Sequence, residues 1–353
     1  MKVIRAMVVG CGRVAQHYKW FLSKGYVNGI AVVGACDTHL DRAEKFCRPF
    51  GARPYQDYRQ ALSEVQPDLV LLLTESGKHY MHAVDIISRG CNIIIEKPVA
   101  LIPEHAHDLD RLATKGGILC CVAFQNRYNK SIRRLKEVVD ANVLGRISTI
   151  AVRLRWCRHQ DYYEDGWHGT WAMDGGVISQ QAIHHIDVLN WLFGPVEEVS
   201  AVCGRRLNSL EAEDTLVAIV RMENGSFATI EATTAARPAD YEASLSVVAE
   251  KGLVEVGGLA LNKVETWTLQ GEDEKFVKMN YSEEVRNAYG MGHIPLLQEV
   301  VDKLRSGRHD SPISPSDAVR AVEIIHMLYA SNELHRWVKR SENARSKYLG
   351  KKI

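Results

Sequence analysis

Five short and almost wholly apolar runs alternate with helical segments over the first third of the sequence. The runs span residues 3–9, 30–36, 69–73, 92–95 and 118–123. Strands of a parallel sheet are buried on both faces, so they lack the polar alternation of an exposed sheet. The segments between them place apolar residues on one helix face, as helices that cover such a sheet do. The pattern predicts repeated βαβ units and a doubly wound parallel sheet in a first domain, residues 1–123.

After residue 123 the pattern changes to strands that alternate apolar and polar residues. Ile150, Val152, Leu154 and Trp156 share one face of a long strand. Further strand-like runs follow at 196–205, 215–222, 227–234, 243–249 and 264–269, and helical segments close the chain. Such alternation is typical of an antiparallel sheet with one covered face. We therefore expect a second domain of α+β class, with a mainly antiparallel sheet, over residues 124–353.

Charge and composition exclude several classes of function. The 353 residues contain 44 Lys and Arg against 43 Asp and Glu, a net charge of +1, so no overall field attracts nucleic acid or an anionic membrane. No apolar run approaches the roughly 20 residues of a membrane span, and the first residues do not resemble a secretory signal. The eight cysteines include no CxxC pair. We expect a cytoplasmic protein with reduced cysteines, no membrane or nucleic-acid partner and no metal.

A glycine turn follows the first strand-like run. Residues 10–15 read Gly-Cys-Gly-Arg-Val-Ala, between a predicted strand and a predicted helix. In this context the first Gly makes the turn, the second admits a pyrophosphate, and the helix N-terminus faces the anion. Asp37 ends the second strand, where a carboxylate binds the adenosine ribose, and Thr38-His39 supplies no cation for a 2′-phosphate. These residues favour NAD over NADP as the cofactor. The alternative is a plain glycine turn followed by an Asp that caps a helix.

A lysine follows the fourth predicted strand. Glu96-Lys97-Pro98 comes directly after the run 92–95, at the carboxyl edge where doubly wound sheets bind ligands. The general expectation for such a lysine is a solvated surface charge. The buried strand before it and the proline after it favour instead a side chain held near the nicotinamide.

A histidine lies on the polar stripe of a predicted helix over residues 174–191. Ile178, Ala182 and Ile186 form the apolar stripe, whereas Gln180, His184 and Asp187 fall on nearly the opposite side. Asp187 lies three residues after His184, within reach to orient its ring, and Gly175-Gly176 would admit a close neighbour or ligand. The alternative is an ordinary histidine on a solvent-facing surface.

Taken jointly, these segments resemble the glucose-fructose oxidoreductase, inositol dehydrogenase and MocA (Gfo/Idh/MocA) family. The resemblance rests on the turn 10–15, on Thr74-Glu75-Ser76-Gly77-Lys78-His79, on Glu96-Lys97-Pro98 and on the helix at 175–187. It implies an N-terminal Rossmann domain, an open-faced antiparallel sheet in the second domain, and hydride transfer between NAD(P) and a carbinol carbon of a sugar or cyclitol. It also assigns proton handling to Lys97 and His184. The implied cofactor contacts are Gly10, Gly12, Arg13, Val14, Asp37, Thr74, Ser76, His79, Glu96 and Lys97.

The sequence departs from the family pattern at three positions. Gln180 stands where the family commonly has Asp, and an amide cannot ionise or join a proton relay. Val177 replaces the usual third glycine, and Glu75 replaces the usual Pro after Thr74. These differences leave the fold expectation intact but leave the substrate contacts open.

Within the family, residues 124–129, Ser76-Gly77 and residues 167–171 are similar to the branch that oxidises nucleotide-linked sugars in surface-polysaccharide synthesis. In such a site Arg127, Arg158 or His168 would pair with the diphosphate, and Tyr162, Tyr163, Trp167 or Trp171 would stack on sugar or base. Alternatively, Arg153, Arg155 and Arg158 line the solvent side of a strand. The candidate substrate contacts are Gln125, Arg127, Tyr128, Asn129, Trp167, His168, Gln180 and Asp187.

The expected activity is therefore NAD(P)-dependent oxidation or reduction at a secondary alcohol of a small-molecule sugar. We favour a nucleotide-linked sugar as the substrate. Two alternatives stay open, a free sugar or inositol dehydrogenase and a non-catalytic regulator that senses the dinucleotide. The exposed face of the predicted sheet also favours a homodimer or homotetramer, since apolar sheet surfaces are normally covered by a partner.

Overall fold

The computed structural model describes residues 2–352, which divide into two compact units. The first contains the chain up to Phe124 together with His293–Val319, and the second contains Gln125–Gly292 and the residues from Arg320 onward. The segment 293–319 thus belongs to the unit of the parallel sheet, whereas the sequence-based boundary assigns it to the second domain. The boundary after residue 123 stays a prediction.

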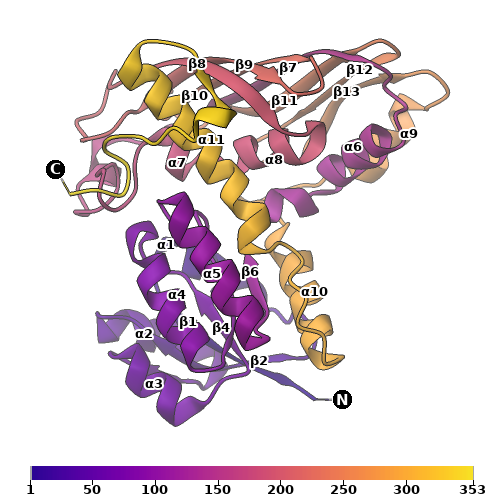
Figure 1. Cartoon of the computed structure of the whole chain (residues 1–353). Helices are drawn as coiled ribbons and strands as arrows, with labels where there is room; N and C mark the ends of the chain where they lie inside the picture. Colours follow the sequence, from indigo (N-terminus) through magenta and orange to yellow (C-terminus); the bar gives the residue numbers. More distant parts are fainter. Residues whose placement is uncertain (1, 353) are drawn as a thin grey trace. The chain divides into compact units, whose positions relative to one another are not determined.

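The first unit is built on a six-stranded parallel sheet (Figure 1). The strands run in the order β3-β2-β1-β4-β5-β6, and Ile4 pairs with Ile30 across β1 and β2 while Ala6 pairs with Leu69 across β1 and β4. All four residues of β4 are buried, as the continuous apolar run predicted. The strands are β1 Ile4–Val9, β2 Ile30–Cys36, β3 Arg53–Tyr55, β4 Leu69–Leu72, β5 Asn92–Ile95 and β6 Cys120–Val122.

Amphipathic helices cover this sheet, and the late segment joins them. Val122 N donates to Ile313 O at 2.9 Å and Cys120 N to Ser311 Oγ at 3.0 Å, so residues 311–313 cover the edge of β6. The helices are α1 Arg13–Ser23, α2 Leu40–Cys47, α3 Tyr58–Val65, α4 His79–Ser88, α5 Pro103–Gly116 and α10 His293–Arg305, with the 3-10 turns η1 Arg48–Phe50 and η2 Ser76–Lys78.

The second unit is built on an eight-stranded sheet in which every neighbouring pair is antiparallel except β7 and β10. Its order is β13-β12-β11-β7-β10-β9-β8-β14. In β9, Leu216 and Ala218 are buried whereas Val217 and Ile219 are about half exposed, so one face is open. The strands are β7 Ile147–Arg155, β8 Val196–Gly204, β9 Thr215–Met222, β10 Phe227–Thr233, β11 Glu242–Ala249, β12 Gly252–Gly257, β13 Lys263–Leu269 and β14 Val338–Lys339.

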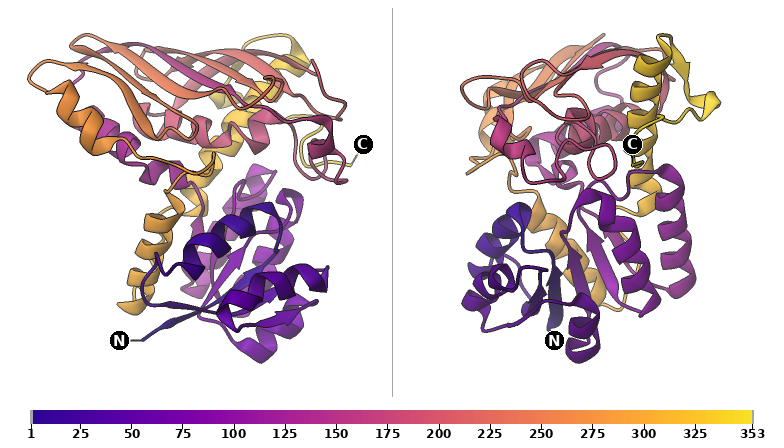
Figure 2. Two further views of the ribbon diagram at one scale, coloured as in Figure 1. Left: turned by 180° about the vertical axis from the view of Figure 1, so that it is seen from behind. Right: turned by 90° about the vertical axis from the view of Figure 1, so that its left-hand side faces the viewer.

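Helices cover the other face of this sheet (Figures 1 and 2), and α6 packs beside α8. They are α6 Lys130–Asp140, α7 Val177–Gln180, α8 Ile183–Phe193, α9 Glu274–Tyr281 and α11 Pro315–Leu334, the last of which begins in the first unit; the 3-10 turns are η3 Gln125–Tyr128, η4 Gln160–Tyr163 and η5 Arg340–Glu342. Together the two sheets confirm the predicted fold class. No helix within residues 2–352 is long and apolar enough to cross a membrane.

The predicted single helix over residues 174–191 is two helices. α7 ends at Gln180, and α8 begins at Ile183. Gln180, His184 and Asp187 are all less than a tenth exposed, so the polar stripe is buried as well. The alternative of a solvent-facing histidine is therefore wrong.

Candidate active site

The glycine turn after β1 has the local geometry that a pyrophosphate requires. Gly10 has φ +95°, and a Cβ there would lie 2.6 Å from the carbonyl oxygen of Leu73, so only glycine fits. At Gly12, the N-cap of α1, an added Cβ would meet nothing within 4 Å, and no side chain at this position caps the helix. No side chain of Gly12 covers the start of α1, where Arg13 is exposed and Val14 is half-buried. This turn fits the pyrophosphate of NAD.

Asp37 directly follows β2 and is held against the same turn. Its Oδ2 accepts the N–H of Cys11 at 2.9 Å, and its Oδ1 accepts the N–H of His39 at 2.9 Å. A carboxylate accepts about four hydrogen bonds, so the oriented group retains capacity for two ribose hydroxyls. Its negative charge disfavours a 2′-phosphate, in agreement with NAD as the cofactor.

His79 ties together the loops that follow β4 and β5. Its Nδ1 lies 2.7 Å from Pro98 O and its Nε2 lies 3.0 Å from Thr74 O, and the ring is fully buried. Burial lowers the pKa of His79 despite these two carbonyls, which favour the protonated ring. Thr74 Oγ1 is also 3.1 Å from His82 Nδ1, and Ser76 is buried in the turn between them. These predicted cofactor residues hold the loop shape, and His79 fixes the backbone next to Lys97.

Glu96 is a buried carboxylate at the base of the Lys97 loop. Its Oε1 accepts the Tyr18 hydroxyl at 3.0 Å and lies 3.2 Å from His293 Nε2, and its Oε2 accepts the N–H of Lys97 at 3.2 Å. Burial alone raises its pKa, but His293, Lys97 and Tyr18 outweigh burial and lower it. An ionised Glu96 thus braces half-buried Lys97 against α1 and α10. No sequence motif pointed to His293, which lies 197 positions away.

A second buried carboxylate begins the helix pair that carries His184. Glu213 packs directly on Gly176, where a Cβ would overlap it, and its Oε1 accepts the N–H of Ile178 at 3.1 Å. Tyr329 donates to Glu213 Oε2 at 2.9 Å and accepts the N–H of Gly176 at 3.0 Å. Burial raises the pKa of Glu213 to about 8. Sequence reasoning missed Glu213; the paired glycines were the only signal that something packs closely there.

His184 faces the carboxamide of Gln125 on η3, with 3.4 Å between the two Nε2 atoms. Gln125 is 2% exposed, and its Oε1 accepts no hydrogen bond from any residue between 2 and 352. Buried acceptors are normally satisfied, so this oxygen is suited to a ligand hydroxyl. The neighbouring His185 differs: burial lowers its pKa to about 4, and its ring lies 6.3 Å from that of Trp156.

Asp187 forms an ion pair with Arg127, and its predicted role in orienting His184 stays a prediction. Arg127 donates to its two oxygens from Nε at 2.8 Å and Nη2 at 2.5 Å, in a buried bidentate ion pair. The Asp187 carboxylate therefore already balances the charge of the Arg127 guanidinium, which the sequence analysis predicted to pair with a diphosphate.

Gln180 is bound to a second carboxylate close in sequence. Its Nε2 donates to Asp174 Oδ1 at 2.6 Å, and Asp174 Oδ2 accepts the N–H of Gly169 at 2.9 Å. Both side chains are buried. The position at which the family commonly has Asp thus carries an amide, but a carboxylate lies within hydrogen-bond distance of it. The sequence did not identify Asp174 as its partner.

Two of the predicted substrate residues, Tyr128 on η3 and Asn129 directly after it, make contacts within the protein. Asn129 Nδ2 donates to Ala260 O at 2.7 Å and Leu261 O at 3.3 Å, and Tyr128 stacks under the Arg133 guanidinium at 4.3 Å. These contacts use the polar group of Asn129 for the loop that follows β12.

Aromatic side chains gather around His168. Its ring lies 3.6 Å from that of Trp167 and 4.3 Å from that of Tyr162, and its Nδ1 is 2.6 Å from Asp165 Oδ2. Burial raises the pKa of Asp165, but His168 outweighs it and the net shift is downward. Two other predicted stacking residues are used internally: Tyr163 bonds Thr234 at 2.7 Å, and Trp171 packs on Tyr329 and Tyr348.

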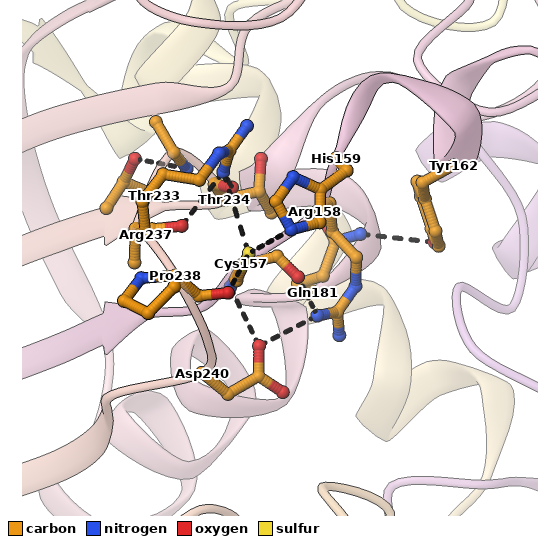
Figure 3. Close-up of polar contacts among 12 residues, drawn as sticks. Cys157, Arg158, His159, Tyr162, Gln181, Thr233, Thr234, Arg237, Pro238 and Asp240 are labelled. Atoms are coloured by element: carbon orange, nitrogen blue, oxygen red, sulfur yellow. Dashed lines mark hydrogen bonds and ion pairs between the residues drawn. The ribbon is translucent and has the colours of Figure 1, made fainter.

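The two arginines of β7 lie on the solvent side of the strand, as the alternative prediction states. Arg153 and Arg155 pair with the carboxylates of Glu231 and Glu242 on neighbouring strands, on the open face of the sheet. Arg158, beyond the end of β7, pairs with Asp240 at 2.9 Å and lies over Tyr162 at 5.6 Å (Figure 3). Arg158 is the one of the three that lies beside the aromatic cluster.

Within residues 2–352 no three His, Cys, Asp or Glu side chains are arranged to hold a metal ion.

Comparison with known proteins places both halves of the chain in one family. Residues 4–124 match the oxidoreductase family with an NAD-binding Rossmann fold, GFO/IDH/MocA, and residues 132–255 match the GFO/IDH/MocA C-terminal domain. Among curated relatives, D-glucoside 3-dehydrogenase of Escherichia coli is 26% identical over 66% of this chain and 70% of its own length. Inositol 2-dehydrogenase 3 of Saccharopolyspora erythraea is 25% identical over 71% and 72%.

Among solved structures, the WlbA dehydrogenase of Chromobacterium violaceum, in complex with NADH and UDP-GlcNAcA, is 28% identical with a TM-score of 0.88 over 96% of both chains. The WlbA dehydrogenase of Bordetella pertussis, with the same two ligands, is 28% identical with a TM-score of 0.84 over 96% of this chain and 99% of that one. The chain therefore belongs to the GFO/IDH/MocA oxidoreductase family, as an NAD-binding enzyme that acts on sugars.

Proposed function

We propose that the enzyme transfers hydride at a ring carbon of a nucleotide-linked sugar and that Lys97 and His184 act on the same substrate hydroxyl. The observation that carries the proposal is the likeness, over 96% of this chain, to two dehydrogenases solved with NADH and UDP-GlcNAcA. The aromatic cluster of Tyr162, Trp167 and His168, with Arg158 over it, supplies stacking surfaces and donors of the kind that a nucleotide needs.

Each proposed catalytic group has a role that follows from its surroundings. When bound, NAD supplies the hydride acceptor. Lys97, held beside ionised Glu96, donates a hydrogen bond to the substrate oxygen and stabilises the negative charge that develops on it. His184 takes the hydroxyl proton at Nε2, the atom that faces Gln125. Gln125 Oε1 accepts a hydrogen bond from a neighbouring hydroxyl of the sugar.

A free sugar or cyclitol is the second candidate substrate. The observation that favours it is charge balance, since Arg127 is paired with Asp187 and Arg158 with Asp240. Two neutralised guanidiniums attract a diphosphate less than two uncompensated ones would. The relatives that act on glucosides and inositols agree with this alternative.

The test is reduction of NAD, followed at 340 nm, with UDP-GlcNAcA, glucose, a methyl glucoside and myo-inositol as substrates. We expect kcat/KM for the nucleotide sugar to exceed that for each free sugar by about 100-fold, because a free sugar makes no contact with the aromatic cluster and Arg158 and so loses their binding energy. Equal or higher values for a free sugar would assign the enzyme to the second class. Self-association through the open sheet face and a cytoplasmic location stay predictions from the sequence.

A further inference from the structure

Cys157 lies where the end of β7 meets the loop that connects β10 to β11. Its backbone bridges Ala235, and its N–H donates to Asp240 Oδ1 at 2.7 Å. The side chain is half-buried, whereas Cys11, Cys36, Cys47, Cys120 and Cys121 are buried. The backbone of Cys157 is therefore held by Ala235 and by the Asp240 side chain, and the residue is partly exposed.

Three polar groups converge on this sulfur (Figure 3). His159 Nε2 lies 3.4 Å from Sγ, Arg237 Nη1 lies 3.7 Å from it, and Pro238 O, at 3.4 Å, can accept the thiol proton's hydrogen bond. The exposed imidazole comes from the same strand end as the cysteine, and the guanidinium comes from the connecting loop. The cysteine therefore sits in a cluster with a base and a cation.

Arg237 is anchored independently of the cysteine. Its Nη1 donates to Ala236 O at 2.8 Å and Thr234 O at 3.2 Å, and its Nη2 donates to Asn208 Oδ1 at 3.0 Å. A guanidinium fixed in this way is positioned in advance to stabilise a negative sulfur. A cavity of about 450 Å³ opens beside it, and its walls include Arg237, Pro238 and Asp240. The guanidinium side of the cluster therefore borders an open cavity.

Burial dominates the environment of the other two half-buried cysteines. Burial raises the pKa of the Cys91 thiol despite Arg89, and it raises the pKa of Cys203 to about 12. Both thiols are therefore protonated and unreactive near neutral pH, because the thiolate is the nucleophile. They serve as internal references of similar exposure.

We propose that Cys157 is a reactive thiol that hydroperoxides oxidise to a sulfenic acid. The imidazole of His159 takes the thiol proton, and the sulfur attacks the terminal oxygen of the hydroperoxide while Arg237 stabilises its charge. An S–O bond forms as the O–O bond breaks, so the sulfur loses two electrons and the peroxide gains them. The departing alkoxide, or hydroxide from hydrogen peroxide, takes the proton from His159 and leaves as alcohol or water. The step uses neither NAD nor the sugar site.

The experiment treats the full-length protein with one equivalent of hydrogen peroxide at pH 7 in the presence of a 1,3-dicarbonyl reagent that traps sulfenic acids. Peptide mass spectrometry then measures the labelling rate of each cysteine. We expect Cys157 to be labelled at least about tenfold faster than Cys91 and Cys203, and Cys157→Ser to abolish the signal. Equal rates at the three half-buried cysteines would overturn the proposal.

The variants His159→Gln and Arg237→Gln test the roles of the two neighbours. We expect each to slow labelling of Cys157 by about fivefold or more, because one removes the base and the other removes the cation. His39→Gln, which changes an exposed histidine in the first unit, is the matched control and keeps the parental rate. Labelling of Cys91 and Cys203 at parental rates shows that each variant is folded. An unchanged Cys157 rate in either test variant contradicts the proposal.

Discussion

Glu96 in the first unit and Glu213 in the second are both buried carboxylates that accept a tyrosine hydroxyl, from Tyr18 and Tyr329 respectively. Each also supports a loop or helix that carries a proposed catalytic group. Their pKa values nevertheless move in opposite directions, downward for Glu96 and upward to about 8 for Glu213.

The difference comes from the cationic neighbours. Glu96 faces His293 and Lys97, whereas the hydrogen-bonding partners of Glu213 are the N–H of Ile178 and the hydroxyl of Tyr329, both neutral donors, and Asp174 adds like charge nearby. Burial penalises the ionised form at both places, and at Glu96 the nearby charges together with the hydrogen bonds outweigh that penalty. The first unit therefore supports its lysine with an anion, and the second supports its histidine helix with an uncharged carboxyl group at neutral pH.

The largest expected effect is on turnover, from removal of Lys97, the cation beside Glu96, or of His184, on the helix that Glu213 supports. Lys97→Ala should lower kcat by about 10²–10⁴, and His184→Ala by a similar factor, because each removes a group proposed to handle the substrate proton or charge. Steady-state NAD reduction at 340 nm measures both. Lys78→Ala is the control, since that lysine pairs with Glu75 on the same edge of the sheet. Near-parental turnover in Lys97→Ala or His184→Ala would refute its assignment.

Removal of the other neighbour of Glu96 should act on stability. His293→Leu takes a hydrogen-bonded partner from a buried carboxylate, and we expect a loss of about 3 kcal/mol in the free energy of unfolding. His185→Leu is the volume-matched comparison, because neither ring nitrogen of this fully buried histidine is hydrogen-bonded within residues 2–352. It should change stability by about 1 kcal/mol or less. Urea denaturation measures both, and equal losses would show that Glu96 does not depend on His293.

The third expected effect develops gradually with pH and comes from Glu213. Its carboxyl group stays protonated up to about pH 8 in the folded protein but ionises near pH 4 when unfolded, so the folded state binds more protons between these values. Its contribution to stability is complete below that window and is lost as pH rises through it, by at most about 1.4 kcal/mol per pH unit. Glu213→Gln should flatten the curve of unfolding free energy between pH 5 and 8. Parallel curves for the two proteins would contradict the raised pKa.

The elements with periodic patterns were predictable from sequence, and those that depend on distant partners were not. The strands β1, β2, β4 and β5 follow from continuous apolar runs, since burial on both faces leaves that signal. β3 contains only Arg53, Pro54 and Tyr55 and carries no such pattern. The break between α7 and α8 was also missed, because the 3.6-residue period continues across residues 181 and 182.

The candidate site divides in the same way. Gly10, Gly12 and Asp37 could be placed from spacing alone, since a tight turn and a strand end are local features. The pairing of Arg127 with Asp187, and of Gln180 with Asp174, depends on side-chain direction inside the folded unit. Residue types and helical spacing suggested Asp187 beside His184, but they do not show which neighbour a carboxylate binds. Whether Lys97 and His184 act together stays a proposal for the variants above to test.

Because residues 293–319 belong to the first unit, that unit is discontinuous in the chain, and this has a consequence for biosynthesis. A nascent polypeptide that has emerged only to Phe124 lacks the hydrogen-bonding partners that Ser311 and Ile313 supply to β6 and the histidine that faces Glu96. The nucleotide-binding half must therefore wait, with an unprotected strand edge, until the ribosome has translated the whole intervening sheet domain. Its maturation is tied to that of its neighbour by the order of translation.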